Sequence, residues 1–111
     1  TVALHDLSHE DKAQAIADAF RYDRLVLATT TYNGDIFPPM RAFLEGLTER
    51  SYRARRVGLI ENGSWAPLAA KVMRGMLEGC RDLTFADTTV RIRSALNDES
   101  RAQLAALAAE L

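Results

Sequence analysis

The fold is decided by one stretch of the chain, Leu25-Val26-Leu27-Ala28-Thr29-Thr30-Thr31-Tyr32-Asn33-Gly34-Asp35-Ile36-Phe37-Pro38-Pro39-Met40. It opens with four consecutive apolar residues, which is typical of a strand buried on both faces of a sheet. A polar loop follows, and Pro38-Pro39 cannot lie inside a helix but can open one. The stretch therefore predicts a buried strand, a loop and a helix in direct succession.

Strand and helix patterns continue to alternate on both sides of this stretch. Further strands are expected at Thr1–Leu7, at Val57–Ile60 and, nearer the sheet edge, at Leu83–Ile92. Four strands alternating with four helices predict an α/β fold with a parallel sheet and helices on its faces. We find no linker or repeat, so residues 1–111 are expected to form a single domain.

The four expected helices begin at residues that favour helix starts. Ser8 and Asn97 are capping residues, and Pro38 and the Ala66-Pro67 pair suit a first turn. Gly79 is expected to end the third helix. The residues expected to face the core are Ala13, Ile16, Ala17 and Phe20; Met40, Phe43, Leu44 and Leu47; Leu68, Val72, Met76 and Leu77; and Leu104, Leu107 and Leu111.

Composition narrows the class of protein. The 111 residues are 48% hydrophobic, and 14 Lys plus Arg against 15 Asp plus Glu leave a net charge of -1. This balance argues against nucleic acid as a partner, and the basic cluster Arg53–Arg56 is expected to be a solvated loop. No apolar run is long enough to span a membrane. Cys80 has no partner for a disulfide, so a reduced, cytoplasmic setting is expected.

The loops Thr29–Phe37 and Glu61–Pro67 are the places to look for a ligand, because ligands of open parallel sheets bind at the carboxyl ends of strands. Each loop couples an aromatic residue, Tyr32 or Trp65, to an Asn-Gly pair. That combination offers a flat wall and free backbone amides, which suits a planar, partly polar heterocycle. The alternative is that both Asn-Gly pairs are ordinary turns.

These two loops resemble those of the flavodoxin-like domain in the A-type flavoproteins, the flavodiiron proteins. The matching runs are Thr29–Met40 and Val57–Ala66, and the likeness extends to Lys71–Met73 and Ser94–Glu99. The resemblance implies a three-layer, doubly wound flavodoxin-like sheet. It also implies an FMN-binding electron-transfer module of an oxidoreductase, which is not catalytic alone. The implied partners are a redox donor and a di-iron metallo-β-lactamase-like domain that reduces oxygen or nitric oxide.

Carried over to this sequence, the resemblance implies a set of flavin contacts. Tyr32 and Trp65 are the stacking candidates, and Gly34 supplies a flexible peptide near the flavin N5. Backbone amides of Gly63 and Ser64 are expected at the pyrimidine edge. The full set of implied FMN-binding residues is Thr29, Thr31, Tyr32, Asn33, Gly34, Asn62, Gly63, Ser64 and Trp65.

The sequence departs from the family at its start, because the first strand, the phosphate-binding loop and the first helix are missing. FMN is therefore expected to bind weakly or not at all. In the flavodoxin order 2-1-3-4-5, the missing strand leaves a gap at the centre of the sheet. We expect a fragment of a longer chain, completed by its own first strand, by another copy through strand exchange, or by a shift of Thr1–Leu7 into the gap.

Other chemistries have less support in the sequence. His5, Asp6, His9 and Glu10 lie close in sequence but without the metal spacing of the family, so we expect no metal site there. Cys80 and Ser64 lack the partners of a nucleophile, which leaves a hydrolase or transferase without a catalytic base. The main alternative is a non-catalytic α/β protein-interaction domain, such as a receiver-like or assembly module.

Overall fold

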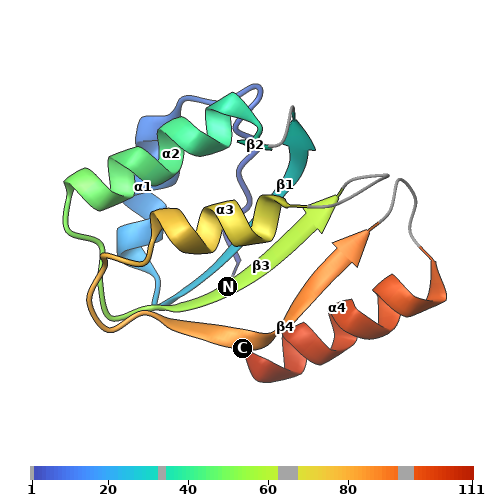
Figure 1. The fold of residues 1–111 in the computed structure, drawn as a ribbon. Coiled ribbons are helices and arrows are strands. Elements are labelled where there is room, and N and C mark those ends of the chain that lie inside the picture. The colour runs from blue at the N-terminus through green and yellow to red at the C-terminus, as the bar shows by residue number, and fades with distance from the viewer. Residues whose placement is uncertain (1, 33–34, 63–67, 93–96) are drawn as a thin grey trace.

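The computed structural model describes residues 2–32, 35–62, 68–92 and 97–111, with the backbone alone for residues 31, 32 and 35. In the described chain, helices and strands largely alternate (Figure 1). The elements in order are α1 (Lys12–Arg21), β1 (Arg24–Tyr32), β2 (Asp35–Ile36), α2 (Pro38–Glu49), β3 (Arg56–Asn62), α3 (Ala69–Met76), β4 (Thr84–Ile92) and α4 (Asp98–Glu110).

The sheet contains three parallel strands and one short antiparallel strand, in the order β2-β1-β3-β4. β1 pairs with β3 in parallel from Arg24 opposite Arg56 to Thr30 opposite Asn62, and β3 pairs in parallel with β4. β2 pairs antiparallel with the last two residues of β1. The predicted parallel α/β sheet with four helices is therefore confirmed in outline, and β4 lies at its edge as expected.

The fourth parallel strand, expected at Thr1–Leu7, is wrong. Residues 2–6 have no regular structure and residues 7–9 form a turn. A strand needs a neighbour, and no backbone hydrogen bond of the described chain joins this segment to β1. Val2 and Leu4 are each 90% exposed, so they also find no apolar surface to cover. The segment therefore does not shift into the vacant position beside β1.

The four helices lie in two layers, one on each face of the sheet (Figure 1). α1, α2 and α3 cover one face, where Leu27, Leu44 and Leu59 belong to the larger apolar core. α4 packs on the other face, where Leu107 joins Ala86 and Val90 in a second, smaller core. A Cβ built on Gly58 would lie 3.0 Å from Leu107, which shows how closely α4 approaches β3.

Local sequence signals locate α2 and α4 well. Pro38 opens α2, and all four apolar residues predicted for it are buried. Asn97 caps α4 through a reciprocal capping box with Ser100, in which the Asn97 Oδ1 accepts from the Ser100 amide at 2.9 Å. Both helices begin where local side chains deal with the unpaired backbone N–H groups of a first turn. Proline at the start of α2 has no N–H group, and the Asn97 side chain accepts a hydrogen bond at the start of α4.

The start and buried face of α1 differ from the expectation. Asp11 caps the helix by accepting from the Ala13 amide, because Ser8 instead hydrogen-bonds to Asp6 in the preceding turn. The later start rotates the buried stripe, which consists of Ala15, Ile16 and Ala19. The limits of the other helices agree more closely, except that α3 begins after Leu68 and ends before the predicted stop at Gly79. Leu68, predicted to face the core, is 40% exposed, and the buried residues of α3 are Ala69, Ala70 and Met73. The α1 residues predicted to be buried but found exposed are Ala13 and Ala17.

β1 is buried on one face only, which corrects the expectation of a strand covered on both faces. Leu27 lies in the larger core, but Val26 is 46% exposed and Ala28 is also exposed. In β3, by contrast, Val57, Gly58 and Leu59 are all buried. The difference arises because α4 packs mainly against β4 and leaves the same face of β1 uncovered.

The basic cluster Arg53–Arg56 is not simply a solvated loop. Arg55 donates hydrogen bonds to the carbonyls of Phe20 and Tyr22 at the end of α1, and its guanidinium lies 5.2 Å from the Tyr52 ring centre. Arg55 therefore joins the end of α1 to the segment that leads into β3. Within the described residues, no helix has both the length and the apolar character needed to cross a membrane.

Candidate functional site

The carboxyl ends of the three parallel strands meet at one edge of the sheet (Figure 1). Thr29 pairs with Glu61 and Thr30 with Asn62, and Asn62 in turn pairs with Ile92 at the end of β4. The two loops singled out by the sequence therefore begin side by side, at Thr29 and Glu61. In open parallel sheets, this edge is where ligands bind.

The structure describes only part of the predicted ligand site. Thr29 and Asn62 are both half-buried and lie near the ends of the neighbouring strands β1 and β3, where Thr29 pairs with Glu61 and Thr30 pairs with Asn62. The backbones of Thr31 and Tyr32 complete β1 and pair with Ile36 and Asp35. The predicted residues that lie outside the described residues are Asn33, Gly34, Gly63, Ser64 and Trp65.

The far side of the first loop is anchored in the core. Ile36 in β2 is buried among the apolar residues of the larger core, and α2 begins at Pro38. Because β2 pairs with the end of β1, both ends of the loop are attached to the sheet. Binding residues often lie on loops that a rigid scaffold positions. The attachment of this loop to the sheet and the core would therefore fix its position relative to a ligand.

Glu61 is a buried carboxylate at the start of the second loop, and sequence reasoning did not assign it a role. The residue is 1% exposed, and its side chain accepts a hydrogen bond from the Ala70 amide at 2.9 Å. Its other oxygen accepts from the Arg91 Nε at 2.8 Å, and Arg91 itself is 61% exposed. Glu61 therefore links β3, the first turn of α3 and β4.

The sequence contains a signal for Glu61. It is a charged residue that directly follows the apolar run Val57–Ile60, and a charge at that point of a strand needs a partner if it is buried. The partners, however, lie 9 and 30 residues further along the chain. Only the pairing of β3 with β4 and the position of α3 bring them together.

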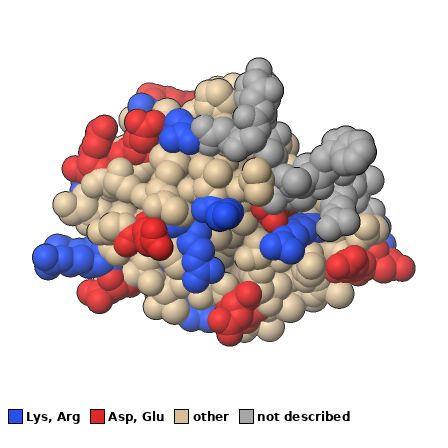
Figure 2. Space-filling view, viewed as in Figure 1, with Lys and Arg blue, Asp and Glu red and all other residues tan. Residues whose placement is uncertain are grey.

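A shallow groove of about 370 Å³ runs beside Glu61, between α3 and β4. Lys71 and Arg74 of α3 and Arg91 of β4 contribute three cations to its lining, against the single carboxylate of Glu61. Arg74 also lies over the Phe85 ring, 4.6 Å from its centre. On the face seen in Figure 2, basic and acidic side chains are interspersed, so the groove is a local cationic feature and not part of a basic surface.

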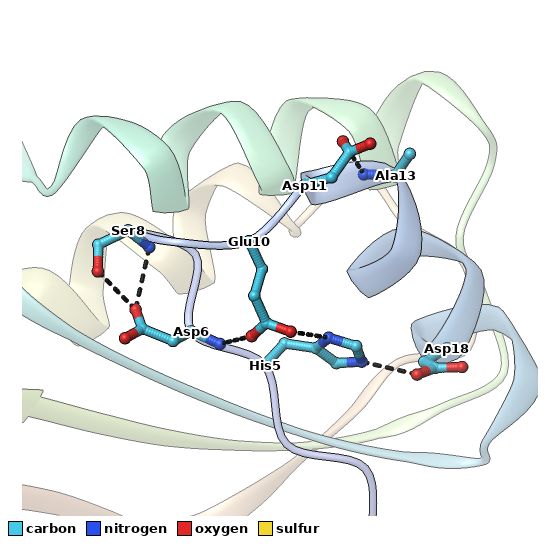
Figure 3. Close-up of polar contacts among 7 residues, drawn as sticks. All are labelled: His5, Asp6, Ser8, Glu10, Asp11, Ala13 and Asp18. Atoms are coloured by element: carbon cyan, nitrogen blue, oxygen red, sulfur yellow. Dashed lines mark hydrogen bonds and ion pairs between the residues drawn. The ribbon is translucent and has the colours of Figure 1, made fainter.

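The acidic and histidine residues near the N-terminus form a polar cluster that ties this segment to α1 (Figure 3). The His5 Nε2 lies 2.6 Å from the Asp18 Oδ2, and its Nδ1 lies 3.5 Å from the Glu10 Oε1. The hydrogen bond to Asp18 raises the pKa of His5, and the Glu10 carboxylate adds to the effect. Glu10 also accepts from the Asp6 amide.

This cluster acts as a set of caps and tethers. His9 is exposed, and its Nε2 lies 3.8 Å from the Asp6 Oδ2. No group of three or more potential metal ligands occurs among residues 2–32, 35–62, 68–92 and 97–111.

Cys80 is a free thiol, half-buried against the larger core, and burial raises its pKa. A raised pKa disfavours the thiolate, which is the nucleophilic form.

Comparison with known proteins adds a structural relative. The sequence matches no known protein family, and no curated protein matches it. The structure is similar to that of rubredoxin oxygen:oxidoreductase from Desulfovibrio gigas, with a TM-score of 0.63 and 16% sequence identity. The similarity covers 87% of this chain and 33% of the other, so the chain spans about a third of the length of that protein. The chain therefore shares the α/β fold of part of an oxidoreductase.

Proposed function

We propose that this chain is the larger part of a flavodoxin-like domain that holds FMN between the loops after β1 and β3 and relays electrons through it. One observation carries the proposal: Thr30 pairs with Asn62, so the two ligand-type loops leave the sheet from adjacent strands. A flat cofactor at this edge would contact both loops at once. The loops provide Tyr32 and Trp65 as flat aromatic surfaces, and each loop also contains an Asn-Gly pair.

The described residues fit the ring portion of such a cofactor. Thr29 and Asn62 offer a hydroxyl and an amide at the adjoining strand ends, and both are half-buried. When bound, FMN supplies the redox chemistry, and the protein supplies position, hydrogen bonds and burial.

The remaining roles belong to the loops themselves. Tyr32 and Trp65 would cover the two faces of the flavin, and the amides of Gly63 and Ser64 would meet its pyrimidine edge. Gly34 would present a peptide near the flavin N5, where a glycine adapts at low cost. Thr31 and Asn33 complete the first loop. The electrons would pass from a redox donor to a di-iron metallo-β-lactamase-like domain.

The likeness to a named oxidoreductase supports a redox role over a hydrolytic one. That protein is called a rubredoxin oxygen:oxidoreductase, and this chain shares the fold of about a third of it. Among the described residues, the only cysteine has its pKa raised by burial, which disfavours a nucleophilic role.

Titration with FMN tests the proposal. We expect added FMN to quench Trp65 fluorescence and to change the flavin absorbance spectrum, with half-saturation at about 1 mM even for a site worth only about -4 kcal/mol. Tyr32→Ala and Trp65→Ala should each weaken binding by about tenfold, because each removes one stacking face. Binding by Trp65→Ala is measured by flavin absorbance, because this variant lacks the tryptophan whose fluorescence is quenched.

The matched control is Tyr22→Ala, which removes a tyrosine just before β1, at the opposite end of that strand. It should leave FMN binding unchanged while the chain stays folded by circular dichroism. A folded chain that shows no spectral change up to about 1 mM FMN would rule out the flavin site. Equal binding by the wild type, Tyr32→Ala and Trp65→Ala would remove the stacking assignment.

A further inference from the structure

The groove between α3 and β4 carries an excess of positive charge. Its cations are Lys71 and Arg74 from α3 and Arg91 from β4. Glu61 is the only carboxylate among the described residues that line it. The Ala70 amide and the Arg91 Nε already donate to that carboxylate. Glu61 therefore offsets part of the charge of Arg91 and leaves the two cations of α3 without compensation.

Lys71 and Arg74 have no carboxylate partner among the described residues, because the ion pairs found there use other cations. Both residues are exposed, so a partner could reach them without rearrangement of the core. The Arg74 guanidinium lies 4.6 Å from the centre of the Phe85 ring, and this contact keeps it on the side of α3 that faces β4. The charges are thus directed toward the groove and available to a ligand.

The segments that follow the two strands beside the groove supply no negative charge. Residues 63–67 come directly after β3, which ends beside Glu61, and residues 93–96 come directly after β4 and Arg91. Neither segment contains Asp or Glu, and the second adds one more basic residue, Arg93. Acidic residues of these segments therefore cannot neutralise the groove.

We propose that this groove is a docking site for an acidic polypeptide segment of another protein. Carboxylates of the segment pair with Lys71 and Arg74 at the groove wall formed by α3. Arg91 uses its Nε for Glu61, and its guanidinium keeps two terminal amino groups that suit one further carboxylate. Complementary charge of this kind speeds association and selects against basic partners.

The groove also offers an apolar contact beside its charges. Leu68, directly before α3, is 40% exposed and lines the groove together with Leu59. A segment that combines acidic side chains with one apolar side chain uses both kinds of contact. Nucleic acid fits less well, because its phosphate backbone requires an extended basic surface. Figure 2 shows acidic side chains interspersed with the basic ones on this face.

A partner in the groove lies beside the second loop. Glu61 and Leu68 both line the groove, and in the sequence they enclose residues 62–67. The partner is thus placed next to the edge of the sheet assigned above to FMN. That consequence rests on the proposed function, whereas the docking itself does not, so docking can be tested without flavin.

Fluorescence anisotropy of a short, fluorescein-labelled peptide rich in glutamate and carrying one leucine tests the docking. We expect saturable binding to the full 111-residue chain without FMN. Binding should weaken as the ionic strength rises from about 0.01 M to about 0.15 M, because the screening length falls from about 30 Å to about 8 Å. The double variant Lys71→Gln/Arg74→Gln should weaken it by about tenfold, since two ion pairs are lost.

The matched control is Lys12→Gln/Arg101→Gln, which removes one exposed lysine and one exposed arginine from α1 and α4. It should leave peptide binding unchanged, and circular dichroism checks that both double variants are folded. A peptide with glutamine in place of each glutamate should not bind. The proposal is wrong if the glutamate peptide does not bind at about 0.01 M salt, or if both double variants weaken binding equally. Tighter binding of a single-stranded oligonucleotide of the same charge would replace the acidic segment with a phosphate ligand.

Discussion

Glu61 shows at the level of one residue how a buried charge is tolerated at this edge of the sheet. The carboxylate would be costly to bury alone, and it is accommodated because an amide and a guanidinium each donate to it. Arg91 remains largely exposed, so only one partner of the ion pair is fully removed from water. The pair therefore serves mainly to fix the start of the second loop against α3.

Replacing Glu61 should destabilise the chain in a graded way. Glu61→Ala leaves the Ala70 amide without its acceptor and is expected to lower the free energy of unfolding by about 3 kcal/mol. Glu61→Gln keeps one acceptor and should cost about 1 kcal/mol. Urea unfolding measures both. Glu49→Ala, at an exposed position in the last turn of α2, is the control and should change stability by less than about 0.5 kcal/mol.

His5 gives the chain a pH-dependent contact. Its pKa is raised above the ordinary value of 6.5 by the hydrogen bond to Asp18. A raised folded-state pKa means that the stabilisation is complete below about pH 6.5 and is lost as the pH rises through the raised value. Stability from this contact should therefore be greater at about pH 5 than at about pH 8, and the segment carrying His5 should be released first.

The variant Asp18→Asn tests this contact by proton NMR titration of the His5 ring. The pKa of His5 should move down toward its ordinary value, because the main partner of the protonated ring is then neutral. Asp23→Asn removes an exposed carboxylate that pairs with Arg24 and should leave the pKa of His5 unchanged. An unaltered His5 titration in Asp18→Asn would show that Asp18 is not the cause of the shift.

At the level of elements, helix packing decides how much room each glycine has. A Cβ built on Gly46 in α2 would lie 2.6 Å from the Ile16 Cδ1 in α1, which is closer than real Cβ contacts. Gly75 in α3 has no atom within 4 Å of the equivalent point. Gly46 therefore permits the close contact of α1 with α2, and Gly75 serves no such purpose.

These two glycines should respond oppositely to larger side chains. Gly46→Val should lower the free energy of unfolding by about 2 kcal/mol, because the added methyl groups displace Ile16. Gly75→Ala should raise it by about 0.5 kcal/mol through helix propensity alone. Urea unfolding of both variants measures the difference. The matched variant Gly75→Val should stay close to the wild type, so a large loss there would contradict the packing explanation.

For the molecule as a whole, the features that can be predicted from the sequence are those that depend on local signals. Two helices, α2 and α4, were located well because their signals are local: prolines at the start of α2 and a capping box at Asn97. The strands β3 and β4 were also found, since runs of apolar and β-branched residues mark them. Of the proposed site, the sequence indicated the two loops, and the structure shows that Thr30 and Asn62, at the ends of β1 and β3, pair with each other.

The errors share one physical cause, which is that burial depends on neighbours. Leu25–Ala28 has the composition of a fully buried strand, yet one face of it stays uncovered because α4 packs mainly on β4. Thr1–Leu7 has strand-like residues but no neighbouring strand among the described residues. An antiparallel β2 of two residues is too short to leave a pattern in the sequence.

The sequence by itself determined the alternation of strands and helices, the limits of α2 and α4, and the two loops that could face a ligand. These features depend on contacts within a few residues, or on periodicity along a single element. Only the tertiary structure decided that Glu61 meets Ala70 and Arg91, and that one face of β1 is left uncovered by the described residues. Such features depend on which distant segments lie side by side, because hydrogen bonding and burial require a partner that local sequence does not specify.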